Sequence, residues 1–197
     1  FRDAVGYQKL DTYATMLGLA TKTNIELAEA TPTVSTLDAV RSAIGQGTHS
    51  YTTANINRYT CTLANGSTVY NLYLVDRVQT ASGEVISKTE PVVDNVADIS
   101  QENLALVKEG MRLVSTDSSK RVLSVLDEQG ITTAGKTGTA QESANRPDHS
   151  LFTGFASYEN PEIVATIVIP YGGGSTNATP AFRDVIAAYY DLDLSGE

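Results

Sequence analysis

The chain has 197 residues, 41% of them hydrophobic, and a formal net charge of −9. This length and apolar content allow one sizeable core and argue against global disorder. The acidic balance, without any run of Lys and Arg, argues against a nucleic-acid-binding protein, so no nucleic-acid partner is expected. One cysteine rules out an intramolecular disulfide framework, and with only two histidines neither a metal site nor a cofactor is expected.

The first third of the sequence predicts helices separated by loops. Apolar residues recur at helical spacing from Leu10 to Leu17, and Gly18 suits a left-handed C-terminal cap. A loop is predicted over residues 21–34, where Pro32 is a breaker. Two more helices are predicted over 36–44 and 52–63, with turns at 45–47 and 65–66.

The middle of the sequence predicts a hairpin and then two helices. Residues 69–78 and 84–88 are rich in strand-forming residues and flank turn residues 81–83, so a β-hairpin is the simplest account. Ser100 is expected to cap a helix. The apolar face of that helix consists of Leu104, Val107, Met111 and Val114. A shorter helix is predicted over Arg121–Leu126, ending near Gly130.

The last third predicts three strands and a helix. The first strand is expected at Lys136–Gly138, and strands over 150–156 and 163–169 follow as an antiparallel hairpin. Because residues 163–169 are apolar on both faces, the sheet needs cover on both sides. A final helix capped by Thr179 and Pro180 supplies cover through Phe182, Val185, Ile186 and Tyr189. The expected fold class is α+β, an antiparallel sheet packed with helices in one domain.

Lys136, Thr137 and Gly138 form a K-T-G triplet typical of serine acyl-transfer enzymes that act on penicillin and cell-wall peptides. In an extended strand, Lys136 and Gly138 share one face, and the glycine keeps that surface open for a substrate backbone. The usual companions are a serine three residues before a lysine and an S-x-N triplet. No lysine of this chain has that serine, and S-x-N occurs only after the K-T-G, at 143–145 and 175–177, where turn chemistry explains it.

Five runs occur in one order along the chain: Ala43–Gly47 (A-I-G-Q-G), Thr62–Gly66 (T-L-A-N-G), Gly135–Gln141 (G-K-T-G-T-A-Q), Asp148–Ala156 and Gly172–Gly174. In this order they resemble the C-terminal part of the transpeptidase domain of a class B, elongation-type penicillin-binding protein. The resemblance covers nearly all of the chain, which makes it far more specific than an isolated K-T-G.

The resemblance implies that residues 1–197 are the C-terminal portion of one penicillin-binding transpeptidase domain. It also implies three of the five strands of the penicillin-binding/β-lactamase-like fold, at about 134–141, 150–158 and 163–169. Phe1–Leu17 resembles the helix that directly follows the S-x-N element. The nucleophilic serine and the S-x-N element are therefore expected upstream of Phe1, and the isolated fragment is expected to be inactive.

The same resemblance implies a peptidoglycan D,D-transpeptidase, which forms an acyl-enzyme with a D-Ala-D-Ala stem peptide, passes it to a second stem peptide and is acylated by β-lactam antibiotics. Lys136 and Thr139 are the expected catalytic residues, the lysine biasing proton transfer and the Thr139 N–H donating to the oxyanion. Thr137, Gly138 and Thr139 are the expected substrate-binding residues. The parent protein would act at the outer face of the bacterial cytoplasmic membrane, anchored by its N-terminal region, with the fragment itself soluble.

Two alternatives share the triplet. A D,D-carboxypeptidase or serine β-lactamase differs in using water to resolve the acyl-enzyme, and the Ala43–Gly47 and Asp148–Phe152 runs disfavour it. A non-catalytic β-lactam sensor or scaffold module would bind ligand without turnover.

Three further expectations concern single features. Without the first two family strands, Ile163–Ile169 becomes an open apolar edge, which we expect to pair with a second copy or a rearranged segment. Cys61 is expected to be a buried, inert thiol, and His149 to have a structural role.

Overall fold

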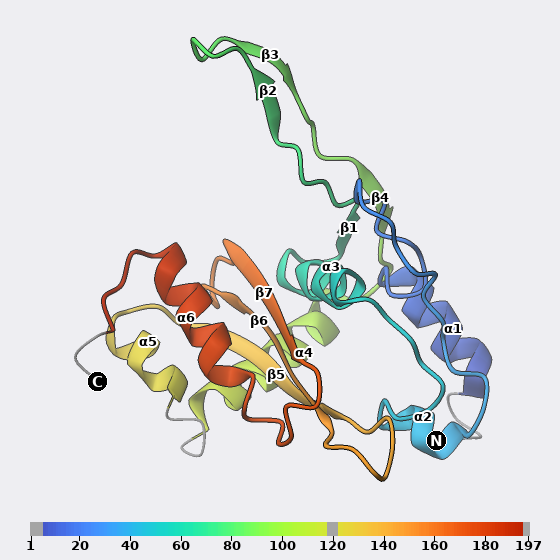
Figure 1. The fold of residues 1–197 in the computed structure, drawn as a ribbon. Coiled ribbons are helices and arrows are strands. Elements are labelled where there is room, and N and C mark those ends of the chain that lie inside the picture. The colour runs from blue at the N-terminus through green and yellow to red at the C-terminus, as the bar shows by residue number, and fades with distance from the viewer. Residues whose placement is uncertain (1–5, 118–121, 195–197) are drawn as a thin grey trace.

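The computed structural model describes residues 6–117 and 122–194 (Figure 1). The elements are α1 (Gly6–Met16), α2 (Ala39–Ala43), α3 (Thr53–Ala64), β1 (Thr68–Tyr70), β2 (Arg77–Gln79), β3 (Val85–Lys88), β4 (Val93–Val96), α4 (Gln101–Thr116), α5 (Ser124–Glu128), β5 (Thr133–Ala140), β6 (His149–Ala156), β7 (Ile163–Ile169) and α6 (Thr179–Tyr189). The predicted α+β class is confirmed.

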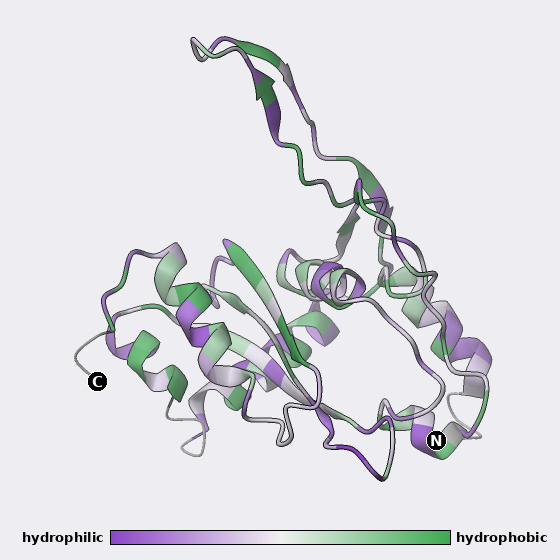
Figure 2. Cartoon of the chain, viewed as in Figure 1, coloured by the Kyte–Doolittle hydropathy of each residue, from purple (hydrophilic) through white to green (hydrophobic). Residues whose placement is uncertain are grey.

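The centre of the fold is an antiparallel sheet in the order β5-β6-β7. Its register is continuous, so that Lys136 lies opposite Thr153 and Gly138 opposite Leu151. Helices cover both faces, as the apolar strand β7 requires, and Figure 2 shows hydrophobic residues along most of β7. On one face Phe152 packs with Phe182 of α6, and on the other Phe155 packs in the cluster that α3 and α4 build.

The stretch of chain that connects α3 to α4 forms an arm that projects from this body (Figure 1). It consists of two antiparallel ladders, β1 with β4 near the body and β2 with β3 at the far end. The predicted single strand over 69–78 is therefore wrong. Its middle leaves the ladder because the loop after α1 takes its backbone donors: the Leu72 N–H donates to the Thr23 carbonyl (2.8 Å) and the Leu74 N–H to the Glu26 carboxylate (2.7 Å).

Most predicted helix ends are set by the residues named from sequence. Gly18 follows α1 with φ +82°, and the hydroxyl of Thr52 caps α3 in a capping box. The helix expected over 36–44 is shorter, because the Asp38 side chain accepts the Arg41 N–H and starts α2 at Ala39. The helix predicted from Arg121 begins in the structure at Ser124, and Arg121 itself lies outside the described residues.

The last helix corrects two predictions. Thr179 does not cap α6: Ala178 takes the cap position, and its N–H donates to the Ser150 hydroxyl (3.0 Å). Val185 and Tyr189 are 41% and 51% exposed rather than buried. The helix meets the sheet through Phe182, Ile186 and Ala187. On α4, Val107 likewise proves exposed, whereas Leu104 and Met111 are buried as predicted.

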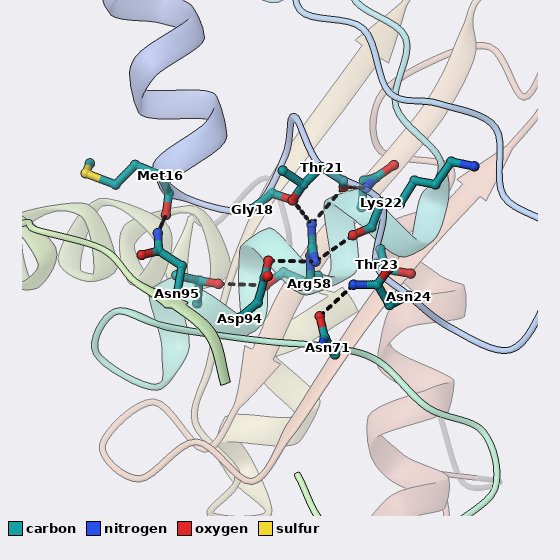
Figure 3. A network of polar contacts seen from close by, with 12 residues as sticks. Met16, Gly18, Thr21, Lys22, Thr23, Asn24, Arg58, Asn71, Asp94 and Asn95 are labelled. Atoms are coloured by element: carbon teal, nitrogen blue, oxygen red, sulfur yellow. Dashed lines mark hydrogen bonds and ion pairs between the residues drawn. The ribbon is translucent and has the colours of Figure 1, made fainter. Parts of the chain in front are cut away.

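A buried arginine joins α3 to α1 and to the base of the arm (Figure 3). Arg58 is 1% exposed, and its guanidinium donates to the carbonyls of Gly18, Thr21 (2.8 Å) and Lys22 (3.0 Å). The carboxylate of Asp94, the second residue of β4, lies 3.6 Å from it. One side chain of α3 thus connects the turn over residues 18–22 with β4, two segments far apart in sequence.

The outer edge of β7 has no strand neighbour among residues 6–117 and 122–194. The expected pairing with a rearranged segment of the same chain is therefore wrong for these residues. Pairing with a second copy stays a prediction.

Gly135 has no room for a side chain. A Cβ there would lie 2.5 Å from the ring of Phe152, which is fully buried, and 2.9 Å from the Thr153 carbonyl. We expect Gly135→Ala to lower the free energy of unfolding in urea by about 1–3 kcal/mol. The matched control is Gly110→Ala in the interior of α4, where a Cβ meets nothing within 4 Å; it should raise stability by about 0.5–1 kcal/mol. Equal effects of the two changes would contradict this explanation.

Candidate active site

The K-T-G triplet lies on an edge strand. β5 pairs with β6 alone, so its other edge is open in the described part of the chain. Lys136 is exposed and lies opposite Thr153, whose hydroxyl is 2.7 Å from that of Thr60 on α3. Gly138 shares this face, since a Cβ there would point at Leu151 (3.2 Å). The predicted alternation, with Lys136 and Gly138 on one face, is therefore confirmed.

Two side chains donate hydrogen bonds to backbone carbonyls of β5. The Lys136 Nζ donates to the Thr137 carbonyl (2.7 Å), and the Gln46 Nε2 donates to the Thr139 carbonyl (3.1 Å). The strand thus places together an ammonium group, two threonines and exposed backbone groups. This arrangement suits the binding of an anionic or carbonyl oxygen and supplies no general base or activated nucleophile.

A cavity of about 820 Å³ lies where β5 ends. Its wall is largely apolar and includes Leu10 and Tyr13 of α1 and Ile56 of α3. On the sheet side it is lined by Ala140 and Leu151, and none of the four predicted site residues lines it. A smaller, polar cavity of about 390 Å³ lies between Gln46 and the loop after β5. The four predicted residues therefore lie together on β5, directly before Ala140 and Gln141, which line these cavities.

The loop between β5 and β6 is tied to the turn after β7 by a cluster that sequence reasoning did not find. The Tyr171 hydroxyl donates to the Glu142 carboxylate (3.1 Å) and accepts from Arg146 (2.8 Å). The Tyr171 N–H donates to Nδ1 of His149 (3.0 Å), which supports the structural role expected for that histidine. The one signal in the sequence was the Asp148–Ala156 run, which contains His149 but not its partners.

Cys61 lies in α3 and is half-buried, which is less enclosed than expected. Burial raises the pKa of its thiol to about 11, so the reactive thiolate is rare at neutral pH. We expect the folded chain to react slowly with iodoacetamide at neutral pH and faster as the pH approaches 11. In urea the pKa should return to about 8.5 and labelling should accelerate. Mass spectrometry of the alkylated chain measures both rates, and rapid labelling of the folded chain at neutral pH would contradict the assignment.

The described residues contain neither a cluster of metal-ligating side chains nor a membrane-spanning helix. Within 6–117 and 122–194, no group of three or more His, Cys, Asp or Glu side chains is placed to hold a metal ion. In the same ranges, no helix combines the length and the apolarity needed to cross a membrane.

Comparison with known proteins gives consistent matches. Residues 1–187 match the family model of the penicillin-binding protein transpeptidase domain. The chain is 30% identical over 177 residues to the peptidoglycan D,D-transpeptidase MrdA of Haemophilus influenzae, covering 80% of this chain and 26% of that protein. It is 27% identical over 199 residues to the peptidoglycan D,D-transpeptidase PbpA of Mycolicibacterium smegmatis, covering 94% and 40%.

Among solved structures, penicillin-binding protein A from M. tuberculosis in an imipenem acyl-enzyme complex superposes with a TM-score of 0.81 at 26% identity, covering 94% of this chain and 42% of that one. The chain thus spans only about a quarter to two fifths of the curated relatives described above.

Proposed function

The chain belongs to the penicillin-binding protein transpeptidase family, and we propose that it forms the C-terminal portion of one transpeptidase domain whose parent cross-links peptidoglycan by serine acyl transfer. The observation that carries this proposal is the K-T-G segment on the open edge of β5, beside two cavities. Two curated relatives are named peptidoglycan D,D-transpeptidases, which supports the proposal. The similar structure of penicillin-binding protein A, an imipenem acyl-enzyme complex, supports it too.

In this proposal the chain supplies one wall of the active site. The ammonium of Lys136 attracts the substrate carboxylate and biases proton transfer at the nucleophile. Thr137 and Thr139 contribute hydroxyls, Gly138 leaves room for the substrate backbone, and the Thr139 N–H stabilises the oxyanion. The attacking serine and the S-x-N element come from sequence that precedes residue 1 in the parent, so residues 1–197 alone bind without reacting.

The proposed substrates follow from this chemistry. A D-Ala-D-Ala stem peptide donates its acyl group to the serine and loses its terminal D-alanine, and the amine of a second stem peptide then resolves the acyl-enzyme. A β-lactam acylates the same serine and stops there. Because peptidoglycan lies outside the cytoplasmic membrane, the parent works at the outer face of that membrane.

Labelling with a fluorescent penicillin, followed by denaturing electrophoresis, tests the proposal. The polypeptide extended upstream through its S-x-x-K element should give a covalent band that disappears when the serine of that element is replaced by alanine. Residues 1–197 alone should give none. A labelled band from residues 1–197 that is lost on substituting one of their own serines would overturn the assignment of roles.

A further inference from the structure

The arm is exposed at its far end and hydrogen-bonded to the body at its root (Figure 1). Every residue of β2 and β3 is exposed, and in the described part of the chain these strands pair only with each other. Nearer the body, the Leu72 N–H donates to the Thr23 carbonyl (2.8 Å) and the Leu74 N–H to the Glu26 carboxylate (2.7 Å). The second bond lowers the pKa of the Glu26 carboxyl, so at neutral pH the acceptor is charged and the bond is a strong one.

The loop that accepts these two bonds is folded around a second carboxylate. Glu29 accepts both the N–H (3.2 Å) and the hydroxyl (2.6 Å) of Thr23, which is fully buried, and the N–H of Asn24 (3.0 Å). The side-chain amide of Asn24 donates in turn to the Asn71 side chain at the arm root (2.9 Å). Because so many of its polar groups are bonded, this loop resists local opening and transmits a displacement of the arm.

The same loop begins at the end of α1, and the arm also contacts α1 directly. The Leu19 N–H, at the start of the loop, donates to the Ala14 carbonyl (2.8 Å). The side-chain amide of Asn95, on β4 of the arm, donates to the Met16 carbonyl (2.9 Å; Figure 3). Ala14 and Leu17 also line the cavity of about 820 Å³. The C-terminal turns of α1 therefore contact the arm and form part of the cavity wall.

We propose that the arm and the C-terminal turns of α1 move as one unit, held together by the Glu26 carboxylate, so that displacing the exposed β2–β3 ladder changes the wall of the 820 Å³ cavity. Coupling between distant sites is carried by contiguous bonded networks, and the bonds from the arm root through the loop to α1 form one. A force on the far end of the arm thereby reaches the cavity. Its effect on transpeptidation rests on the proposed function, whereas the coupling itself does not.

Amide hydrogen exchange of the chain, followed by NMR, tests the coupling. Glu26→Ala removes the acceptor of the Leu74 N–H and leaves the bonds of Leu72 and Leu19 in place. We nevertheless expect the Leu72 and Leu19 amides to exchange about two- to tenfold faster, because the unit that they share has lost one hydrogen bond. Glu26→Gln keeps a side-chain oxygen acceptor and should restore most of the protection. Glu84→Ala removes an exposed carboxylate next to β3 and, as the matched control, should change neither amide.

The coupling should also act in the reverse direction, because a coupling free energy is reciprocal. Ala14→Gly weakens the end of α1 without touching the arm, and it should speed exchange of the Leu72 amide in the arm root. Ala105→Gly makes the same change at an exposed position of α4, and it should leave that amide unchanged.

A fluorescent reporter tests the effect on the cavity. The chain has no tryptophan, so Tyr13→Trp places a single one on the cavity wall. In that background, Glu26→Ala should shift the emission and Glu84→Ala should not. The proposal is overturned if Glu26→Ala leaves the Leu19 amide or the emission unchanged, or if Glu84→Ala changes them equally. None of these measurements uses a β-lactam, so their outcome is separate from that of the penicillin labelling.

Discussion

Replacing Lys136 with alanine is expected to slow acylation by a fluorescent penicillin about 10²- to 10⁴-fold in the polypeptide that also carries the serine. The change removes the cation that would attract the ligand carboxylate and bias proton transfer. The fold should survive, because the side chain is exposed and its hydrogen bond is to the neighbouring Thr137 carbonyl. Stopped-flow or gel-based acylation rates measure the effect, and urea unfolding checks the fold.

Two controls separate this role from a general effect of charge. Lys88→Ala removes an exposed lysine at the far end of the arm and should leave the acylation rate unchanged. Lys136→Arg keeps the charge but alters its shape and donors, and should recover part of the rate. If Lys136→Ala were acylated as fast as the unmutated polypeptide, Lys136 would have no role in the proposed reaction.

The sequence was most informative where structure depends on neighbouring residues. The strand Ile163–Ile169 was predicted at its observed bounds, because a run of seven residues, all apolar except Thr166, stands between turn-forming segments. Ser100 caps its helix as predicted, since capping is a contact with residues one turn away. The face of α6 was predicted less well: the periodicity predicted an apolar face that included Val185 and Tyr189, but the helix packs on the sheet through Phe182, Ile186 and Ala187.

Long-range contacts were outside the reach of the sequence pattern. The segment after β1 is rich in strand formers, yet Leu72 and Leu74 give their N–H groups to Thr23 and Glu26, almost 50 residues earlier. The candidate site shows the same limit. The motif identified the strand residues, but the partner of the Thr139 carbonyl is a side chain whose position depends on the whole fold.

Replacing Arg58 with alanine is expected to lower the free energy of unfolding by about 3–5 kcal/mol, a large part of a typical domain's stability. Burial lowers the pKa of its guanidinium, while the carboxylates of Asp94 and Glu29 oppose that shift. Arginine side chains are effectively always protonated in proteins, so the buried group is a cation. Its loss would remove the guanidinium donors from the carbonyls of Gly18 and Lys22, in the turn that follows α1 (Figure 3).

Urea unfolding, followed by circular dichroism, measures this cost against a matched arginine. Arg41→Ala removes a side chain that is 75% exposed and 3.4 Å from the Asp38 carboxylate, so it should cost less than about 1 kcal/mol. Arg58→Lys keeps the charge but has a single donor group, which cannot reach three carbonyls at once, so it should recover only a minor part of the loss. If Arg58→Ala were no more destabilising than Arg41→Ala, the guanidinium would not be what holds α1, α3 and the arm together, and apolar packing between them would have to supply that stability instead.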